Sequence, residues 1–333
     1  MSIVENACRL RILPEQICAD HYQEDPDVPR LVEMITHKIP VLKEVENHSA
    51  RLSRPVAMAL SFARQLTEKL GRPRRLDRNL WTKDPFIPIL FDSPEDGVKV
   101  LRRSKALRYV FETQATADCF FLMIMRRHEF EIIGSELDGE IIKRDVLQTV
   151  ISFQDHAIPI AAFSEQKAHA TIVDEIVLYL AQLIPERLRQ AELMRGELEH
   201  SEMLLKAQIH TLEQASRQHK AYDVPAKIRT KLEDGLQEAD LFTDKLKALP
   251  KNPTPPEYLG LVRNVLLHPD KHLFVDDVRV HVQEYGIKVS QDKGREIRFM
   301  EFRAWGVQRL AVLFAVMGRE TAVQLWPELG KEN

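Results

Sequence analysis

The chain has 333 residues, of which 44% are hydrophobic and 29% are charged. This apolar content can build a sizeable core, which excludes a mostly disordered chain, and the length predicts about two domains. The 47 Lys and Arg residues and 50 Asp and Glu residues give a net charge of −3, which argues against a uniformly basic nucleic-acid-binding protein.

Three cysteines, Cys8, Cys18 and Cys119, are present, without a Cys-x-x-Cys pair. This pattern argues against a disulfide framework and a structural zinc site, and it fits a reducing compartment. The first residues lack a basic region followed by a long apolar stretch, so we expect no signal peptide. The most apolar runs, 117–125 and 310–317, are under half the roughly 20 residues of a membrane helix. We expect a cytoplasmic protein with no membrane insertion, no metal and no cofactor.

The N-terminal region, residues 1–75, is predicted to be helical. Apolar residues recur at helical spacing in two stretches between residues 28 and 70, and Pro40 should kink or shorten the first helix. A further helix is expected to begin after Ser93, because Ser93 is a suitable N-cap and Pro94 suits the first helical position. We expect that helix to end near Phe111.

The residue pattern changes at Asp118. Short β-rich stretches alternate with polar breaks, and Asp138-Gly139 is a strong hairpin signal. We predict an antiparallel meander of four or five strands over residues 118–163, so that residues 76–166 form a helix-plus-meander module.

Residues 167–249 carry the clearest pattern in the chain. Apolar residues repeat every seven positions up to about Lys220, Pro225 breaks the helix, and a second apolar stripe follows from Ile228. Sustained heptads predict a coiled coil, and a short break between two such helices predicts an antiparallel hairpin. The seam that we expect to mediate interaction contains Ile184, Leu188, Leu198, Leu205, Ile209, Leu212, Ile228, Leu232, Phe242 and Leu246.

The chain then continues with a Pro-rich linker, residues 250–256, and a second helix-plus-meander module, residues 257–333. Periodicity does not decide whether residues 308–317 form a strand or a helix. The fold class that we predict is α+β: a helical N-terminal region, and two small antiparallel β-meander modules that flank a long antiparallel coiled-coil hairpin.

No sequence motif assembles a catalytic set. Gly-x-Gly-x-x-Gly, Walker A, Gly-x-Ser-x-Gly and His-Glu-x-x-His are all missing from the sequence, and we name no catalytic residue. We therefore favour a non-catalytic interaction or scaffold protein, whose hairpin mediates homo-oligomerisation or recruits a protein partner. An enzyme of unrecognised type is the third possibility.

The second possibility is nucleic-acid binding through the basic segment 64–108, which has 12 Lys and Arg against 6 Asp and Glu. Gly71-Arg72-Pro73-Arg74-Arg75 resembles the core of an AT-hook, although Leu70 stands where an Arg should precede the Gly. Arginines at loops and helix ends can bind phosphates. The candidate phosphate contacts are Arg72, Arg74, Arg75, Arg78, Arg102, Arg103 and Arg108.

Overall fold

The computed structural model describes residues 25–77, 86–91, 93–138, 141–217, 226–248, 252–283, 286–291, 293–304 and 309–330. The chain divides into two compact units, which we describe separately. The first comprises Met1–Met34, Ser49–Leu180 and Asn264–Asn333; the second comprises Ile35–His48 and Ala181–Arg263. The domain boundaries predicted from composition stay a prediction.

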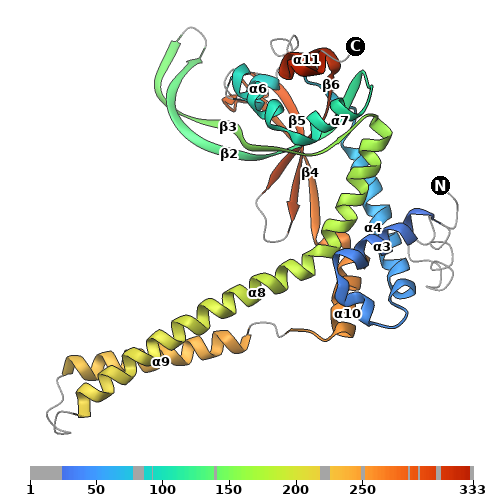
Figure 1. Ribbon diagram of the computed structural model, residues 1–333. Coiled ribbons are helices and arrows are strands. Elements are labelled where there is room, and N and C mark those ends of the chain that lie inside the picture. Colours follow the sequence, from blue (N-terminus) through green and yellow to red (C-terminus); the bar gives the residue numbers. More distant parts are fainter. Residues whose placement is uncertain are drawn as a thin grey trace. The chain divides into compact units, whose positions relative to one another are not determined.

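The first unit contains a single sheet whose strands differ in length (Figure 1). Its strands lie in the order β3-β2-β6-β5-β4, all antiparallel, and β1 pairs in parallel with β6. The strands are β1 (Arg74–Arg75), β2 (Asp118–Asp138), β3 (Ile141–Ala162), β4 (Leu273–Val282), β5 (Arg295–Ala304) and β6 (Leu310–Gly318). The ambiguous segment 308–317 is therefore mostly a strand.

The two edges of this sheet meet through a short segment that follows β4. The backbone N–H of Lys288 donates to the carbonyl of Thr149 on β3 at 2.8 Å, and the N–H of Val289 donates to His281 on β4 at 2.9 Å. Gly286, at φ +77°, begins this segment, and a Cβ there would lie 2.2 Å from the carbonyl oxygen of Ile151. Only glycine suits this close approach, which lets the sheet curl onto itself.

The strands differ from the predicted meanders. Residues 118–163 form two strands of 21 and 22 residues instead of four or five short ones, and both predicted meander regions contribute to one sheet. The polar breaks are absorbed inside the long strands by register shifts, one of them between Gly134 and Glu136. Bulges let a strand continue past an irregular residue, so a polar break does not have to be a turn.

Apolar side chains fill the inside of the curled sheet. Three rings meet there: Phe153 lies 5.8 Å from Phe86 and 5.2 Å from Phe299 between centroids, with both pairs edge-to-face. Helices cover this part of the core: α5 (Ile87–Leu90), α6 (Pro94–Arg103), α7 (Lys105–Thr113) and α11 (Arg319–Leu325).

The helix predicted from Ser93 to Phe111 is divided in two. Ser93 caps α6 as expected, since its Oγ accepts a hydrogen bond from the N–H of Asp96 at 3.2 Å. Ser104 then caps α7 by accepting from the N–H of Leu107 at 3.2 Å. A second cap inside the predicted helix ends the first one and begins another.

The other helices of the first unit include α4 (His48–Lys69) and the beginnings of α3 (Asp27–Lys38) and α8 (Glu165–Arg217). The Arg30 guanidinium on α3 holds the Asp174 carboxylate of α8 at 2.7 Å. His169 of α8 lies 4.7 Å from Phe314 of β6 between ring centroids, so this end of α8 contacts the sheet. As predicted, α3 ends before Pro40, which begins the short 3₁₀ helix Pro40–Glu44.

The second unit contains the rest of α8, then α9 (Ala226–Ala248) and most of α10 (Pro255–Leu267). Two contacts give the direction of α9 against α8. Thr243 Oγ1 donates to Glu202 Oε1 at 3.2 Å, and a Cβ at Gly235 would lie 3.2 Å from Ile209. Because the α9 number falls as the α8 number rises, the two helices run antiparallel (Figure 1).

Candidate functional site

Two of the residues predicted for the seam lie on the face of α8 that contacts α9. Leu205 and Ile209 are the side chains nearest to Gly235, and Ile209 is 8% exposed. Ile184 is buried as well, and the half-buried members are Leu188, Leu198, Leu205, Leu212, Phe242 and Leu246. Ile228 and Leu232 belong to α9, but their side chains lie outside the described part of the chain.

A different face of α8 carries exposed apolar residues. Leu193 is 56% exposed and Leu204 is 54% exposed. Glu197 and His200 lie between them and are exposed too. Spacings of four, three and four residues put these side chains on one side of a helix, away from the seam. We call Leu193, Glu197, His200 and Leu204 the outer stripe.

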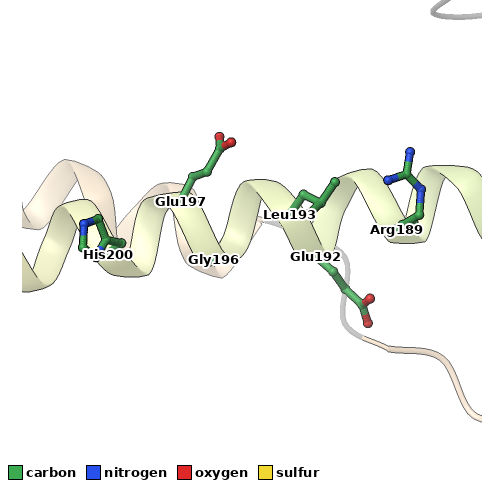
Figure 2. Close-up of a pocket in the computed structure, with 6 residues that line it drawn as sticks. All are labelled: Arg189, Glu192, Leu193, Gly196, Glu197 and His200. Carbon is green, nitrogen blue, oxygen red and sulfur yellow. The ribbon is translucent and has the colours of Figure 1, made fainter.

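The outer stripe passes through a shallow, open depression of about 530 Å³. Figure 2 shows the side chains that line it, all from α8, with Leu193 and Glu197 pointing to the same side of the helix. They are Arg189, Glu192, Leu193, Gly196, Glu197 and His200. A depression formed by a single helix does not enclose a small molecule, so it is better suited to another protein surface.

The charged residues of the outer stripe differ from the neighbouring Arg189 in their ion pairs. Arg189 is occupied by Glu186 of the same helix at 2.6 Å, and this hydrogen bond lowers the pKa of Glu186. Among the described residues, by contrast, none forms an ion pair with the side chains of Glu197 or His200. These two groups remain available to a second molecule.

Several of the arginines predicted to contact phosphate already bind other groups of the chain. Arg75 Nη2 holds Asp118 at 3.0 Å and its Nε binds Asp77, while Arg108 holds Glu112 at 2.6 Å. The Arg74 guanidinium stacks 4.8 Å above the Phe86 ring. Arg72, Arg102 and Arg103 are exposed to solvent and make no such contact with the described residues. Arg78 lies outside the described residues.

The sequence analysis missed a group of charged residues inside the first unit. Glu301 on β5 is only 1% exposed, and Arg127 on β2 reaches its Oε1 with Nε at 3.3 Å. The group extends through further ion pairs at 3.6–4.0 Å. We call it the buried charge cluster: Arg127, Glu129, Lys288, Glu301 and Arg309.

A sequence signal for this cluster does exist. Phe121, Met123 and Met125 alternate along β2 on the buried face, and Arg127 occupies the next position of that alternation. Ile297, Phe299 and Glu301 do the same on β5. A charge in an inward position of an otherwise apolar strand is uncommon, because burying a charge is expensive.

Within the described ranges, no group of three or more His, Cys, Asp or Glu is placed to hold a metal ion. None of the helices searched there has the length and apolar content to cross a membrane. Comparison of the chain with family models, curated proteins and solved structures finds no match.

Proposed function

We propose that the protein is a non-catalytic interaction protein of the cytoplasm, and that two copies associate through the outer stripe of α8. The observation that carries the proposal is the order of residues in this stripe. Leu193, Glu197, His200 and Leu204 read apolar, acidic, basic when protonated, apolar. When a second copy of this helix runs in the opposite direction, each residue of the stripe faces a residue that complements it.

Reversal is what a two-fold axis produces between antiparallel helices. An axis between Glu197 and His200 sets each Leu193 opposite the partner's Leu204, and each Glu197 opposite the partner's His200. A two-fold interface uses the same patch on both copies, so one stripe supplies all four contacts. The imidazolium form of His pairs with a carboxylate, and its neutral form still hydrogen-bonds to one.

The heptad seam supports this arrangement. We propose that α8 and α9 form the coiled-coil hairpin predicted from the sequence, with the seam side of α8 closed by α9. Knobs-into-holes packing would then keep α8 straight and present its outer stripe as a rigid surface. The seam would stabilise the hairpin, and the stripe would mediate the association.

Nucleic-acid binding by the basic segment is a less favoured proposal. Three of its arginines, Arg74, Arg75 and Arg108, already contact aromatic or acidic groups of the chain. Neutralising Arg72, Arg102 and Arg103 together tests it, because any retained nucleic acid should then be lost.

The test of self-association uses sedimentation equilibrium over a range of protein concentrations. A single helix face makes a small interface, so we expect a reversible dimer. Replacing Leu193 and Leu204 by Gln keeps helix propensity while removing four leucines from the dimer. At about 1 kcal/mol for each half-buried leucine, dissociation should become about a thousandfold easier.

Two comparisons keep the test specific. Leu236→Gln with Leu241→Gln removes two leucines of α9 that are 48% and 60% exposed and lie outside the stripe, and it should leave the dimer intact. Exchanging Glu197 and His200 (Glu197→His with His200→Glu) preserves their complementarity and should preserve the dimer. A wild-type chain that stays monomeric, or equal weakening by both leucine pairs, would refute the proposal.

A further inference from the structure

The buried charge cluster combines five charged side chains that come from distant parts of the chain. Arg127 and Glu129 belong to β2, Lys288 to the segment that closes the sheet, Glu301 to β5, and Arg309 precedes β6. Their charges sum to +1, with three cations against two carboxylates. The cluster thus carries a net positive charge.

Its ion pairs are long. Arg127 Nη1 lies 3.7 Å from Glu129, Lys288 Nζ lies 3.6 Å from Glu129, and Arg309 Nη1 lies 4.0 Å from Glu301. Charge-assisted hydrogen bonds between such groups are about 2.7–2.9 Å long. A nearby pair has that length: Arg303 holds Asp276 at 2.7 Å. The charged groups of the cluster therefore attract one another without forming short hydrogen bonds.

Among the described residues, these long separations leave one carboxylate oxygen of Glu301 without a hydrogen bond. Its side chain is 2% exposed, and its Oε1 accepts a hydrogen bond from no described residue, although Arg127 Nε is 3.3 Å away. A buried carboxylate oxygen without a donor costs free energy, and native proteins satisfy nearly all such atoms with protein, water or ligand. A donor from outside the chain would complete this site.

The exposed fractions of the side chains indicate how such a donor would reach Glu301. The side chains of Lys288 and Arg309 are 44% and 57% exposed, whereas that of Arg127 is 14% exposed. The cluster thus runs from cations open to solvent inward to the buried carboxylate. A ligand that enters past the cations would meet Glu301 last.

A ligand that fits has two properties. It carries negative charge for Arg127, Lys288 and Arg309, and it carries an O–H or N–H donor for Glu301. We propose that the buried charge cluster binds an oxyanion that bears its own proton, of which hydrogen phosphate is the simplest. Near neutral pH phosphate keeps at least one proton, whereas sulfate keeps none. Glu301 therefore accepts a hydrogen bond from phosphate and repels sulfate.

The experiment is isothermal titration calorimetry of the full chain with inorganic phosphate and with sodium sulfate, at equal ionic strength. We expect phosphate to bind at least tenfold more tightly than sulfate. Glycerol phosphate, titrated in parallel, shows whether the free ion or a hydroxyl-bearing monoester is the better ligand, and tighter binding of either one supports the proposal.

Variants assign the binding to the cluster. Glu301→Gln should abolish the preference for phosphate, because the amide can donate to sulfate and no longer repels it. Arg309→Gln changes a side chain that is 57% exposed, so the fold should survive, and phosphate binding should fall about tenfold. The matched control, Arg298→Gln, removes an arginine that is equally exposed at 57% but pairs with Asp277 instead, and it should leave phosphate binding unchanged.

Thermal unfolding of each variant shows that it is folded before titration. The proposal is overturned if phosphate does not bind to the wild-type chain, if phosphate and sulfate bind equally, or if Arg309→Gln leaves phosphate binding unchanged.

Discussion

Asp77 binds Gly318, which lies 241 residues further along the chain: its Oδ1 accepts a hydrogen bond from the N–H of Gly318 at 3.1 Å. Gly318 is the N-cap residue of α11, and Thr321 of that helix donates to the same oxygen at 3.0 Å. The other carboxylate oxygen binds Arg75. Burial acts to raise the pKa of Asp77, but the hydrogen bonds from Arg75, Gly318 and Thr321 outweigh burial and lower it.

Replacing Asp77 by Asn should lower the free energy of unfolding by about 1–3 kcal/mol at neutral pH, because charge-assisted hydrogen bonds are lost. The folded-state pKa lies below the unfolded value of about 3.9, so this stabilisation is present above about pH 4 and disappears as pH falls through the folded-state pKa. Urea unfolding at a series of pH values should show the wild-type and variant curves converging in acid. A gap of constant size down to about pH 2 would contradict the assignment.

Gly235 is predicted to be required for the close approach of α8 and α9. A Cβ there would lie 3.2 Å from Ile209 Cγ1, and a larger side chain would separate the helices. We expect Gly235→Leu to reduce the stability of the second unit by about 1–3 kcal/mol, despite the better helix propensity of leucine. Circular dichroism during urea unfolding measures the change.

Gly260 provides the matched control for this substitution. It lies in α10, in the same unit, and a Cβ there would meet nothing within 4 Å. Gly260→Leu should therefore stabilise its helix slightly or leave stability unchanged. Equal destabilisation by the two variants would mean that Gly235 does not mark a packing contact.

Local signals predicted several elements correctly because their physics is local. Ser93 caps α6 through a hydrogen bond to a residue three positions later, and Pro40 prevents α3 from continuing. The linker predicted over residues 250–256 stays a prediction, and the helix that follows, α10, begins at Pro255. These features depend on only a few neighbouring residues.

The sheet could not be derived in the same way. β6 reads as an apolar run because it is buried on both faces, and its pairing with β2 joins residues almost 200 positions apart. The buried charge cluster depends on the same pairings, since they bring Arg127 close to Glu301. The outer stripe of α8 could not be derived either, because its two leucines stand outside the heptad repeat of this helix.

Arg127 and Glu301 should be strongly coupled in stability. Arg127→Met leaves a buried carboxylate without its nearest cation, which should cost about 3–5 kcal/mol. The double variant Arg127→Met with Glu301→Leu removes both charges and should be more stable than Arg127→Met alone. A double-mutant cycle by urea unfolding measures the coupling, and effects that add within about 0.5 kcal/mol would exclude it.

The exposed pair of Arg298 and Asp277 is a useful reference for that cycle. Its separation is shorter, 2.7 Å, but the two side chains are 57% and 33% exposed. Solvent screens such pairs, so its coupling should be below about 1 kcal/mol. If the exposed pair couples as strongly as Arg127 and Glu301, burial does not set the strength of these interactions.

Cys119 should be unreactive in the folded protein. It is 0% exposed on β2, and burial raises the pKa of its thiol to about 12. Because the thiolate is the reactive form, its alkylation at pH 8 should be at least about a thousandfold slower than that of an exposed thiol. Peptide mapping by mass spectrometry after N-ethylmaleimide treatment measures the rate at this residue. Ser290→Cys places a thiol at an exposed position and serves as the reference. Urea should raise the rate at Cys119 to that reference, whereas rapid labelling in native buffer would show that the β2 end of the core opens readily.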